Sequence, residues 1–507
     1  MALKGTTKIE LTNVITKEVE VIEKTNLVTN AVSDVLTMNP YGYRFRKEDV
    51  RIEGQATSFQ AAFMPLCPNL FGGILLYENQ LEENPEKYYA DMNNPIVGYS
   101  SNNVSPADDP KRGSMNQSES GPLEDGTGYR FVFDFATSQG NGLISALGLT
   151  SRMGGTGGHG STQDTYKNNA VKVGFFMSST ETGTTKDPDI GQANIVSIDP
   201  EKGEALYAYV SGQNTIKLGK FKFPIDNIGL VFQYSNVLEK IPYSETAVYT
   251  QYFASVLDQY GVFYGTLIDG GDGYIYGLQH DGNAKGNSSG QAKIRWIKIS
   301  KEDYSATEGT WTVDAQLLQF GEYYTGESSS TYYKGINHAI IDNGILYAIK
   351  YTSNQYMHGV YTIPLENTTD ISLLKFNDGY GWVYSTENSS GYGMRRCTSV
   401  NKIGGVIVYR AGYISGGELH TRNSTLSGSQ DTWGCLTDAG KPGVSCGPYI
   451  FGITEEADNR GFLSVYLQSC YLATINNLPA SVLKTADKTM KITYVLREDT
   501  TTEEAEQ

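Results

Sequence analysis

The sequence predicts a mainly β protein, with a β-propeller-like domain and a small terminal β/α module. A β-sandwich is the alternative architecture for the larger domain. Tyrosine is frequent, with 36 residues against 18 phenylalanines, glycine is plentiful at 56 and proline is low at 16. This composition is typical of short strands joined by tight turns. Both ends of the chain alternate apolar and polar residues, and a glycine turn followed by a tyrosine-containing apolar strand recurs in the middle.

The first fifty residues predict a hairpin followed by a helix. "TKIELTNV" and "KEVEVIE" alternate along two strands, and "TNLVTNAVSDVLTMNP" follows them. In that segment Thr25 is the expected N-cap and Pro40 lies beyond the end. The apolar residues that share one helical face are Leu27, Val28, Ala31, Val32, Val35 and Leu36. We expect the C-terminal segment 476–498, which includes "KTMKITYVLRE", to pair with the hairpin, so that residues 1–50 and 476–498 form one module.

The middle of the chain predicts the larger domain. Residues 51–128 are polar and rich in turn residues, which indicates an irregular connector with long loops. Residues 129–475 contain the repeated units, whose turn glycines are about sixty to seventy residues apart. These glycines are Gly203, Gly273, Gly344 and Gly405. A degenerate repeat of small sheets predicts a propeller of five to seven blades, and residues 499–507 form an acidic tail.

Three segments of the chain resemble minor structural or tail-fibre proteins of tailed bacteriophages and prophages of Gram-positive hosts. They are "KGTTKIELTNVITKEVEVIEKTNLVTNAV" at the start, "FVFDFATSQGNGLISALGLTS" before the repeats, and "YLATINNLPASVLKTADKTMKITYVL" at the end. The resemblance covers roughly a sixth of the chain. We expect an appendage at the tail, baseplate or collar whose terminal module, inferred from the alternating strands at both ends, docks to the particle. The resemblance implies a non-enzymatic component of the virion with a host-facing or particle-stabilising role. It also implies homo-oligomers and contacts with other tail, neck or capsid proteins.

Composition excludes several other roles. The formal net charge is −16, and no basic cluster is present that could bind nucleic acid through its phosphates. No run of eighteen apolar residues predicts a membrane span, and the first residues contain no apolar signal core. We therefore expect a chain made in the cytoplasm. The resemblance implies that this is the cytoplasm of the host and that the chain is carried on the virion.

The loop "GTGGHGST", residues 155–162, partly matches a nucleotide-binding motif. Gly155, Gly157 and Gly160 fit Gly-x-Gly-x-x-Gly, but Ser161 stands where a P-loop needs lysine. The motif also needs a helix after the loop, and "STQDTYKNNAVKVGFF" has no helical apolar stripe. The sequence therefore predicts a surface loop, no bound nucleotide and no cofactor.

Acidic residues near strand ends raise two further hypotheses. Asp269 and Asp272 in "IDGGDGYIYG" could chelate calcium, although the pattern lacks the spacing of an EF-hand and a turn is the favoured interpretation. A virion-associated glycan hydrolase would need two carboxylates across a pocket. The acids that could serve are Glu204, Asp272, Asp342 and Glu455. A capsid-surface decoration protein is the remaining alternative function.

Aromatic residues are the last candidate site. The pairs Tyr323–Tyr324 and Tyr332–Tyr333 flank "GESSS", and Trp311 precedes them. Such rings could stack on the sugars of a host-surface glycan or contact a protein partner. Core packing is the alternative interpretation for the tryptophan.

Overall fold

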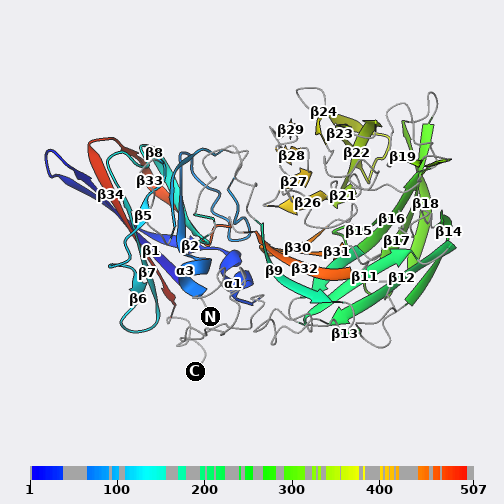
Figure 1. Ribbon diagram of the computed structural model, residues 1–507, viewed down its shortest axis with the longest axis horizontal. Coiled ribbons are helices and arrows are strands. Elements are labelled where there is room, and N and C mark those ends of the chain that lie inside the picture. The colour runs from blue at the N-terminus through cyan, green and yellow to red at the C-terminus, as the bar shows by residue number, and fades with distance from the viewer. Residues whose placement is uncertain are drawn as a thin grey trace. The chain divides into compact units, whose positions relative to one another are not determined.

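The computed structural model shows a mainly β protein that divides into two compact units (Figure 1). Unit 1 comprises Met1–Val173, Gly447–Tyr449 and Leu467–Gln507, and unit 2 comprises Gly174–Cys446 and Ile450–Tyr466. The structure describes residues 3–37, 66–90, 94–101, 109–152, 154–155, 170–177, 194–199, 202–210, 213–222, 239–240, 246–254, 266–280, 291–314, 323–326, 329–332, 339–353, 356–375, 381–382, 400–403, 406–409, 412–415, 418–421, 443–455, 461–468 and 471–499.

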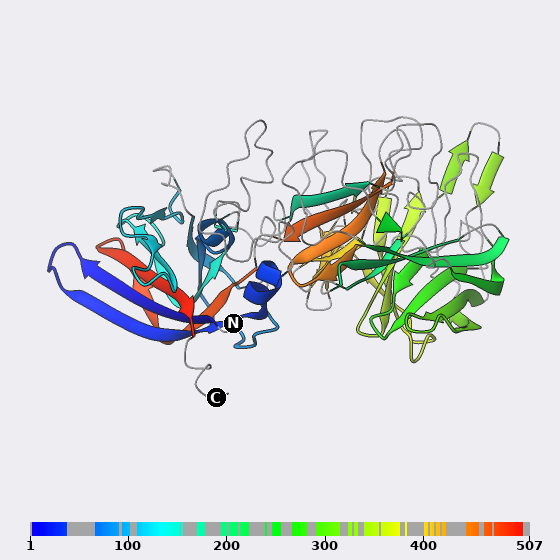
Figure 2. The same ribbon diagram turned by 90° about the horizontal axis from the view of Figure 1, so that it is seen from below.

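Unit 1 is built on one large sheet with the strand order β4-β3-β8-β33-β2-β1-β34-β7-β5, and β6 pairs with β7. Its strands are β1 (Leu3–Asn13), β2 (Val19–Val28), β3 (Gly73–Tyr77), β4 (Ile96–Ser100), β5 (Ser114–Met115), β6 (Gly121–Pro122), β7 (Gly128–Phe135), β8 (Gly142–Thr150), β33 (Thr474–Lys484) and β34 (Lys488–Glu498). Two short helices accompany it, α1 (Asn30–Thr37) and α3 (Leu66–Leu70). Figures 1 and 2 show β1 and β34 side by side.

The two ends of the chain meet in this sheet. β34 pairs with β1 along its whole length, from Leu3 opposite Glu498 to Asn13 opposite Lys488. The pairing of the C-terminal strand with the N-terminal hairpin, expected from the sequence, is therefore present. The alternation of apolar and polar residues explains this pairing, because the even-numbered residues of β34 from Met490 to Leu496 are buried and their neighbours are not.

The sheet of unit 1 is nearly closed, like a barrel. At its two edges Tyr99 and Arg112 form a parallel bridge. The Tyr99 amide donates to the Lys111 carbonyl at 3.0 Å, and the Gly113 amide donates to the Tyr99 carbonyl at 2.8 Å. The interior is filled by side chains that lie in rows across β1, β34 and β7, namely Thr7–Tyr494–Phe131, Ile9–Ile492–Phe133 and Leu11–Met490–Phe135. These rows form the core of unit 1.

The helix predicted after the hairpin is shorter than expected. It begins at Asn30, and the preceding residues through Val28 belong to β2. Leu27 and Val28 pair with Ile475 and Thr474 of β33. The pairing with two neighbouring strands outweighs the helical pattern of this segment, so Thr25 is a strand residue and not an N-cap. Ala31 and Val32 are buried, as a helix face there requires.

Two further expectations about domain boundaries differ from the sheet pairing. Part of the expected connector 51–128 forms β3 and β4, whose residues are all buried within unit 1. β7 and β8, which we expected to begin the larger domain at residue 129, pair with β34 and with β33 and β3. The larger unit therefore starts after β8, because these strands complete the sheet that holds both ends of the chain.

The described residues of unit 2 form five antiparallel sheets and one separate hairpin. The first sheet holds β10 (Asn194–Asp199), β11 (Glu204–Val210), β12 (Gln213–Lys222), β13 (Glu239–Lys240) and β14 (Thr246–Ala254). The second holds β15 (Thr266–Asp269), β16 (Tyr274–His280), β17 (Gln291–Ser300) and β18 (Ala306–Asp314), and the hairpin is β19 (Tyr323–Gly326) with β20 (Ser329–Tyr332).

The remaining three sheets follow in chain order. The third holds β21 (Ala339–Asp342), β22 (Ile345–Ser353), β23 (Tyr356–Pro364), β24 (Ser372–Lys375) and β25 (Gly381–Trp382). The fourth holds β26 (Val400–Ile403), β27 (Val406–Tyr409), β28 (Gly412–Ser415) and β29 (Glu418–Thr421). The fifth holds β30 (Val444–Cys446), β31 (Tyr449–Glu455), β32 (Gly461–Gln468) and, as its last strand, the much earlier β9 (Ala170–Met177).

The repeated glycines lie in the turn between the first and second strands of these sheets. Gly203, Gly273 and Gly344 have φ values of 65°, 86° and 74°, and Gly447 has the same role in the fifth sheet with φ 55°. A residue with a side chain is strained at such φ values, which explains why glycine recurs there. Gly405 lies outside the described residues.

The first three sheets of unit 2 pack face to face. Leu206, Ala208 and Leu218 of the first sheet share a core cluster with Ile275 and Ile297 of the second. On its other face the second sheet shares a cluster with the third, which includes Leu278, Ile294, Leu346 and Tyr361. The first strands of the five sheets also contact one another in a closed series, β10–β15–β21–β26–β30–β10.

Candidate functional site

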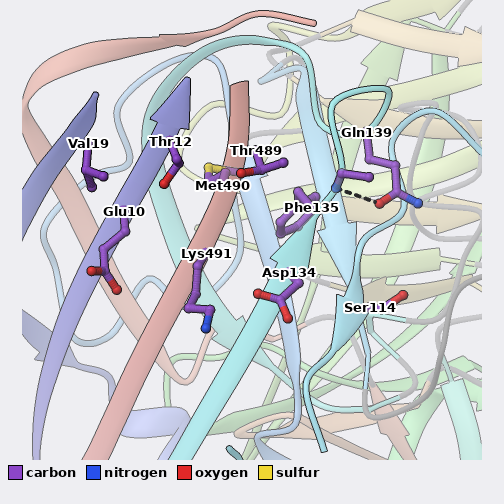
Figure 3. Close-up of a pocket in the computed structure, with 11 residues that line it drawn as sticks. Glu10, Thr12, Val19, Ser114, Asp134, Phe135, Gln139, Thr489, Met490 and Lys491 are labelled. Carbon is purple, nitrogen blue, oxygen red and sulfur yellow. Dashed lines mark hydrogen bonds between the residues drawn. The ribbon is translucent and has the colours of Figure 1, made fainter. Parts of the chain in front are cut away.

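A groove of about 540 Å³ lies on the outer face of the sheet of unit 1 (Figure 3). Its floor is a row of side chains from three neighbouring strands, with Glu10 on β1, Lys491 on β34 and Asp134 on β7. Thr12 and Thr489 form the next row, and Val19 of β2 forms one rim. These residues face outward because their neighbours in each strand fill the interior.

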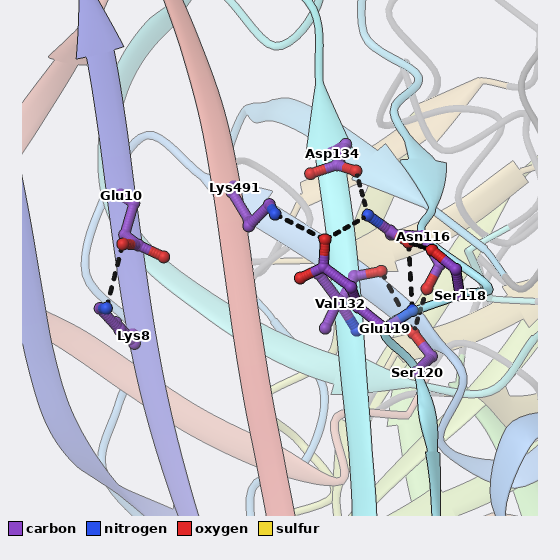
Figure 4. Close-up of polar contacts among 9 residues, drawn as sticks. All are labelled: Lys8, Glu10, Asn116, Ser118, Glu119, Ser120, Val132, Asp134 and Lys491. Atoms are coloured by element: carbon purple, nitrogen blue, oxygen red, sulfur yellow. Dashed lines mark hydrogen bonds and ion pairs between the residues drawn. The ribbon is translucent and has the colours of Figure 1, made fainter. Parts of the chain in front are cut away.

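An ion-pair network fixes the charged groups of the groove (Figure 4). The Lys491 ammonium donates to Glu119 at 2.8 Å, and Lys8 pairs with Glu10 at 3.0 Å. The Asn116 amide donates to Glu119 and to Asp134, both at 2.9 Å. The hydrogen bond between Lys491 and Glu119 raises the pKa of Lys491 and lowers that of Glu119.

The network fastens one segment of the chain onto the sheet. Residues 114–127 run from β5 past β6 to β7, and Glu119 lies in the middle of this segment. A second ion pair, between Arg497 and Asp125 at 3.1 Å, fixes the segment to the end of β34. Lys491 and Asp134 of the groove floor thus hold this segment through Glu119 and Asn116.

An exposed apolar surface lies at one end of unit 1, where three turns meet. The turns are residues 14–18 between β1 and β2, 136–141 between β7 and β8, and 485–487 between β33 and β34. Val14 donates its amide to the Asp487 carbonyl at 2.9 Å, and Lys484 donates to the Ala136 carbonyl at 2.9 Å. We call this region, with its exposed residues Val14, Ile15, Leu143 and Leu483, the turn end.

The first of these turns is held in one conformation. The side-chain oxygen of Asn13 accepts from the amides of Ile15 and Thr16 at 2.8 and 3.0 Å. Its side-chain amide donates to Asp487 at 2.8 Å, and an Asn side chain that bonds the following backbone stabilises a tight turn. Ile15 is thereby fixed in an outward position with 78% of its surface exposed.

Apolar exposure is concentrated in unit 1. Among the described residues, one large exposed hydrophobic side chain, Tyr274, lies in unit 2. All the others belong to the turn end or to the adjoining face of β2, namely Val14, Ile15, Val19, Val21, Leu143 and Leu483. A group of exposed apolar side chains at one end of a unit is typical of a contact surface for another protein. In the sequence, Val14 and Ile15 could have indicated this surface, because apolar residues are unusual in a tight turn.

The aromatic residues of the predicted site lie in two different places. Tyr323 and Tyr324 lie on β19, and Tyr323 is paired in register with Tyr332 of β20. Tyr333 lies outside the described residues. Trp311 of β18 packs against the core between the second and third sheets, with ring centroids 5.8 Å from Trp296 and 6.4 Å from Tyr276. Trp311 thus takes part in core packing.

The carboxylates considered for metal binding or hydrolysis are bound to lysines. Asp269 pairs with Lys301 at 2.6 Å, and Asp342 pairs with Lys402 at 2.6 Å. Glu204 pairs with Lys220 at 3.3 Å. The side chain of Glu455 lies outside the described part of the chain. In the described residues no three His, Cys, Asp or Glu side chains form a group that could hold a metal ion.

Asp272 lies in the tight turn between β15 and β16. Its carboxylate accepts from the Tyr276 hydroxyl and from Lys298, both at 2.9 Å. Partial burial opposes ionisation of Asp272, but the hydrogen bonds from Lys298 and Tyr276 outweigh it and lower the pKa. A low pKa does not suit the general acid of a glycosidase, which must hold a proton near neutral pH.

Comparison with other proteins gives no family for this chain. No family model matches the sequence, and no curated protein is detectably similar to it. No described helix is long and apolar enough to cross a membrane. The loop 155–162 lies outside the described residues from 156 onward, and the next described element is the strand β9. The surface loop without a bound nucleotide, expected from the sequence, therefore stays a prediction.

Proposed function

We propose that the protein is a structural component of a bacteriophage virion, an appendage at the tail, baseplate or collar. In this proposal unit 1 attaches the chain to other particle proteins. One observation carries the proposal. The three segments that resemble phage structural proteins lie far apart in the sequence, yet they supply six adjacent strands of one sheet, β8-β33-β2-β1-β34-β7. Segments that build one unit are expected to share one role, and we propose that this role is docking to the particle.

The turn end is the proposed attachment surface. It presents Ile15 and Val14 on a rigid turn, and Leu143 and Leu483 face each other beside it. Burying one such aliphatic side chain in an interface contributes about 1.5–3 kcal/mol. A partner that covers the turn end would therefore gain most of its affinity from these four side chains. The same surface serves for homo-oligomers if the partner is a second copy.

Unit 2 is proposed to be a five-bladed β-propeller. The closed series of first strands, the face-to-face packing of the first three sheets and the turn glycines support this architecture. The fifth sheet also combines three C-terminal strands with β9, so the two ends of unit 2 are joined in one sheet. An electron density map with five radial sheets around a channel would support the propeller, whereas two stacked layers would favour a sandwich.

A propeller on the virion would present its loops to the host, and a cell-surface glycan is the proposed ligand. The hairpin β19–β20, which carries three of the predicted tyrosines, supports the proposal because it forms a two-stranded sheet of its own, apart from the five larger sheets. Binding of the purified protein to host cells, without release of reducing sugar, is the expected result. Release of sugar would instead favour the hydrolase.

The attachment of unit 1 is tested by Ile15→Glu. A charged residue at this position would oppose burial, so the affinity for the partner should fall roughly 10–100-fold. The measurement is the number of copies of the protein on purified particles grown with the variant. Tyr274→Glu is the matched control, because Tyr274 is the one exposed large hydrophobic side chain described in unit 2. If Ile15→Glu particles carry the wild-type number of copies, unit 1 does not attach through the turn end.

A further inference from the structure

The turn between β7 and β8 contains an Asn-Gly pair with unusual surroundings. Asn141 is exposed, and its side-chain amide donates to the Thr137 carbonyl at 2.9 Å. Its side-chain oxygen accepts from the Lys484 ammonium at 2.8 Å. Gly142 cannot be replaced without strain, because its φ is 150° and an added Cβ would lie 2.8 Å from Val97 Cγ1. The fold therefore imposes glycine directly after Asn141.

Lys484 is a buried cation without an anionic partner. Only 1% of its surface is exposed, and its ammonium donates to two neutral oxygens, the Ala136 carbonyl at 2.9 Å and Asn141 Oδ1. Among the described residues no carboxylate lies within ion-pair distance of it. Burial accordingly lowers the pKa of Lys484 to about 8. A buried charge of this kind is stabilised strongly by any carboxylate placed beside it.

We propose that Asn141 is a deamidation site, and that the resulting aspartate forms an ion pair with Lys484. In the first step the Gly142 nitrogen attacks Asn141 Cγ. A bond forms between these two atoms, the Cγ–Nδ2 bond breaks, and Nδ2 leaves as ammonia with the proton from the Gly142 nitrogen. Water then opens the cyclic imide at Cγ, which restores the original backbone with aspartate at position 141.

Lys484 favours this reaction in two ways. Its hydrogen bond to Oδ1 draws electrons from Cγ and stabilises the negative charge that develops on the oxygen during the attack. It also stabilises the product, because the new carboxylate occupies the position of the amide oxygen that already lies 2.8 Å from Nζ. Opening at Cγ keeps this geometry, whereas opening at the main-chain carbonyl would lengthen the backbone and displace the carboxylate.

The chain contains a second Asn-Gly pair that serves as an internal reference. Asn343 and Gly344 also lie in an exposed turn, but Asn343 donates its side-chain amide to the Asp342 carboxylate at 3.3 Å. Deamidation at Asn343 would place a second carboxylate beside Asp342, and the two like charges would repel. The two sites thus share the same dipeptide and differ in the sign of the neighbouring charge.

The kinetic test compares the two sites in the full-length protein. The protein is incubated near neutral pH, where Lys484 keeps its proton, and peptide mass spectrometry follows the conversion of amide to carboxylate at both positions. We expect Asn141 to convert several-fold faster than Asn343 and to yield mainly aspartate. Lys484→Met should slow conversion at Asn141 and leave Asn343 unchanged. Equal rates at the two sites, or no effect of Lys484→Met, would overturn the proposal.

The stability test examines the product directly. Asn141→Asp should raise the melting temperature of unit 1 by roughly 2–4 °C near neutral pH, and Lys484→Met should cancel this gain. Asn343→Asp should give no gain. An Asn141→Asp variant no more stable than the wild type would contradict the ion pair. The outcome does not depend on attachment to a virion, because both measurements use the isolated protein.

Discussion

At the scale of single residues, the buried ammonium of Lys484 predicts a specific pH dependence of stability. Below pH 8 Lys484 is charged in the folded and the unfolded chain, so the cost of burying the charge is fully present. Between about pH 8 and its usual pKa of 10.5 the folded chain releases the proton first. The unfolded chain then binds more protons, and the free energy of unfolding rises with pH through this window.

Lys484→Met should abolish that rise. The rise amounts to about 2 kcal/mol, because solvent near the turn reduces the full effect of the pKa shift. The measurement is urea unfolding of both proteins from pH 7 to pH 10.5, with Lys17→Met, an exposed lysine, as the control. Parallel stability curves for Lys484→Met and the wild type would show that Lys484 does not titrate in this range.

Single residues also show what a sequence can and cannot reveal. The turn glycines Gly203, Gly273 and Gly344 were predictable, because a positive φ leaves a local signature in the amino-acid type. The environment of Trp311 was not, since a tryptophan in a strand suits a binding platform and a core equally well. The partner of Lys484 depends on a turn 343 residues away in the chain, which no local pattern encodes.

At the scale of elements, a glycine of β18 leaves room for a tryptophan ring of the neighbouring strand β17. Gly309 lies opposite Trp296 in the register, and a Cβ at Gly309 would lie 2.4 Å from the indole ring. Gly309→Ala should therefore displace the ring and cost about 1–3 kcal/mol. The expected readouts are a lower urea midpoint and altered tryptophan fluorescence.

A matched glycine exchange provides the reference for this prediction. Gly121 of β6 has no heavy atom within 4 Å of its added Cβ, so Gly121→Ala should change stability by less than about 0.5 kcal/mol. If both exchanges lower the stability equally little, the Trp296 ring does not pack against Gly309.

Strands were easiest to predict where they have one wet face or follow a turn glycine. β1 and β34 alternate in burial, and the sequence shows the same alternation. β3 and β4 are buried on both faces, so their short apolar runs lack a period of two. They lie among polar turn-rich segments, which made the surrounding region look like a connector. The groove on β1, β34 and β7 was equally invisible, because it needs three strands from distant parts of the chain.

At the scale of the whole molecule, unit 2 is inserted into a hairpin of unit 1. The end of β8 pairs with the start of β33, with Asn476 opposite Leu147 and the Ala473 amide donating to the Leu149 carbonyl at 2.7 Å. Between these paired strands the chain passes through all of unit 2. Sequence patterns place strands but do not pair them across such a distance, which is why residue 129 looked like a domain boundary.

The insertion predicts two separable unfolding transitions. Each unit has its own buried core, represented by Phe133 in unit 1 and Ile297 in unit 2. Truncating a fully buried residue of this size costs about 2–5 kcal/mol. Phe133→Ala should therefore lower the melting temperature of one calorimetric transition by on the order of 10 °C and leave the other unchanged. Ile297→Ala should do the reverse. A single transition that shifts with either exchange would mean that the two units unfold as one cooperative body. Two independent transitions would mean that unit 1 keeps its nearly closed sheet when unit 2 unfolds, as an attachment module that carries an inserted domain must.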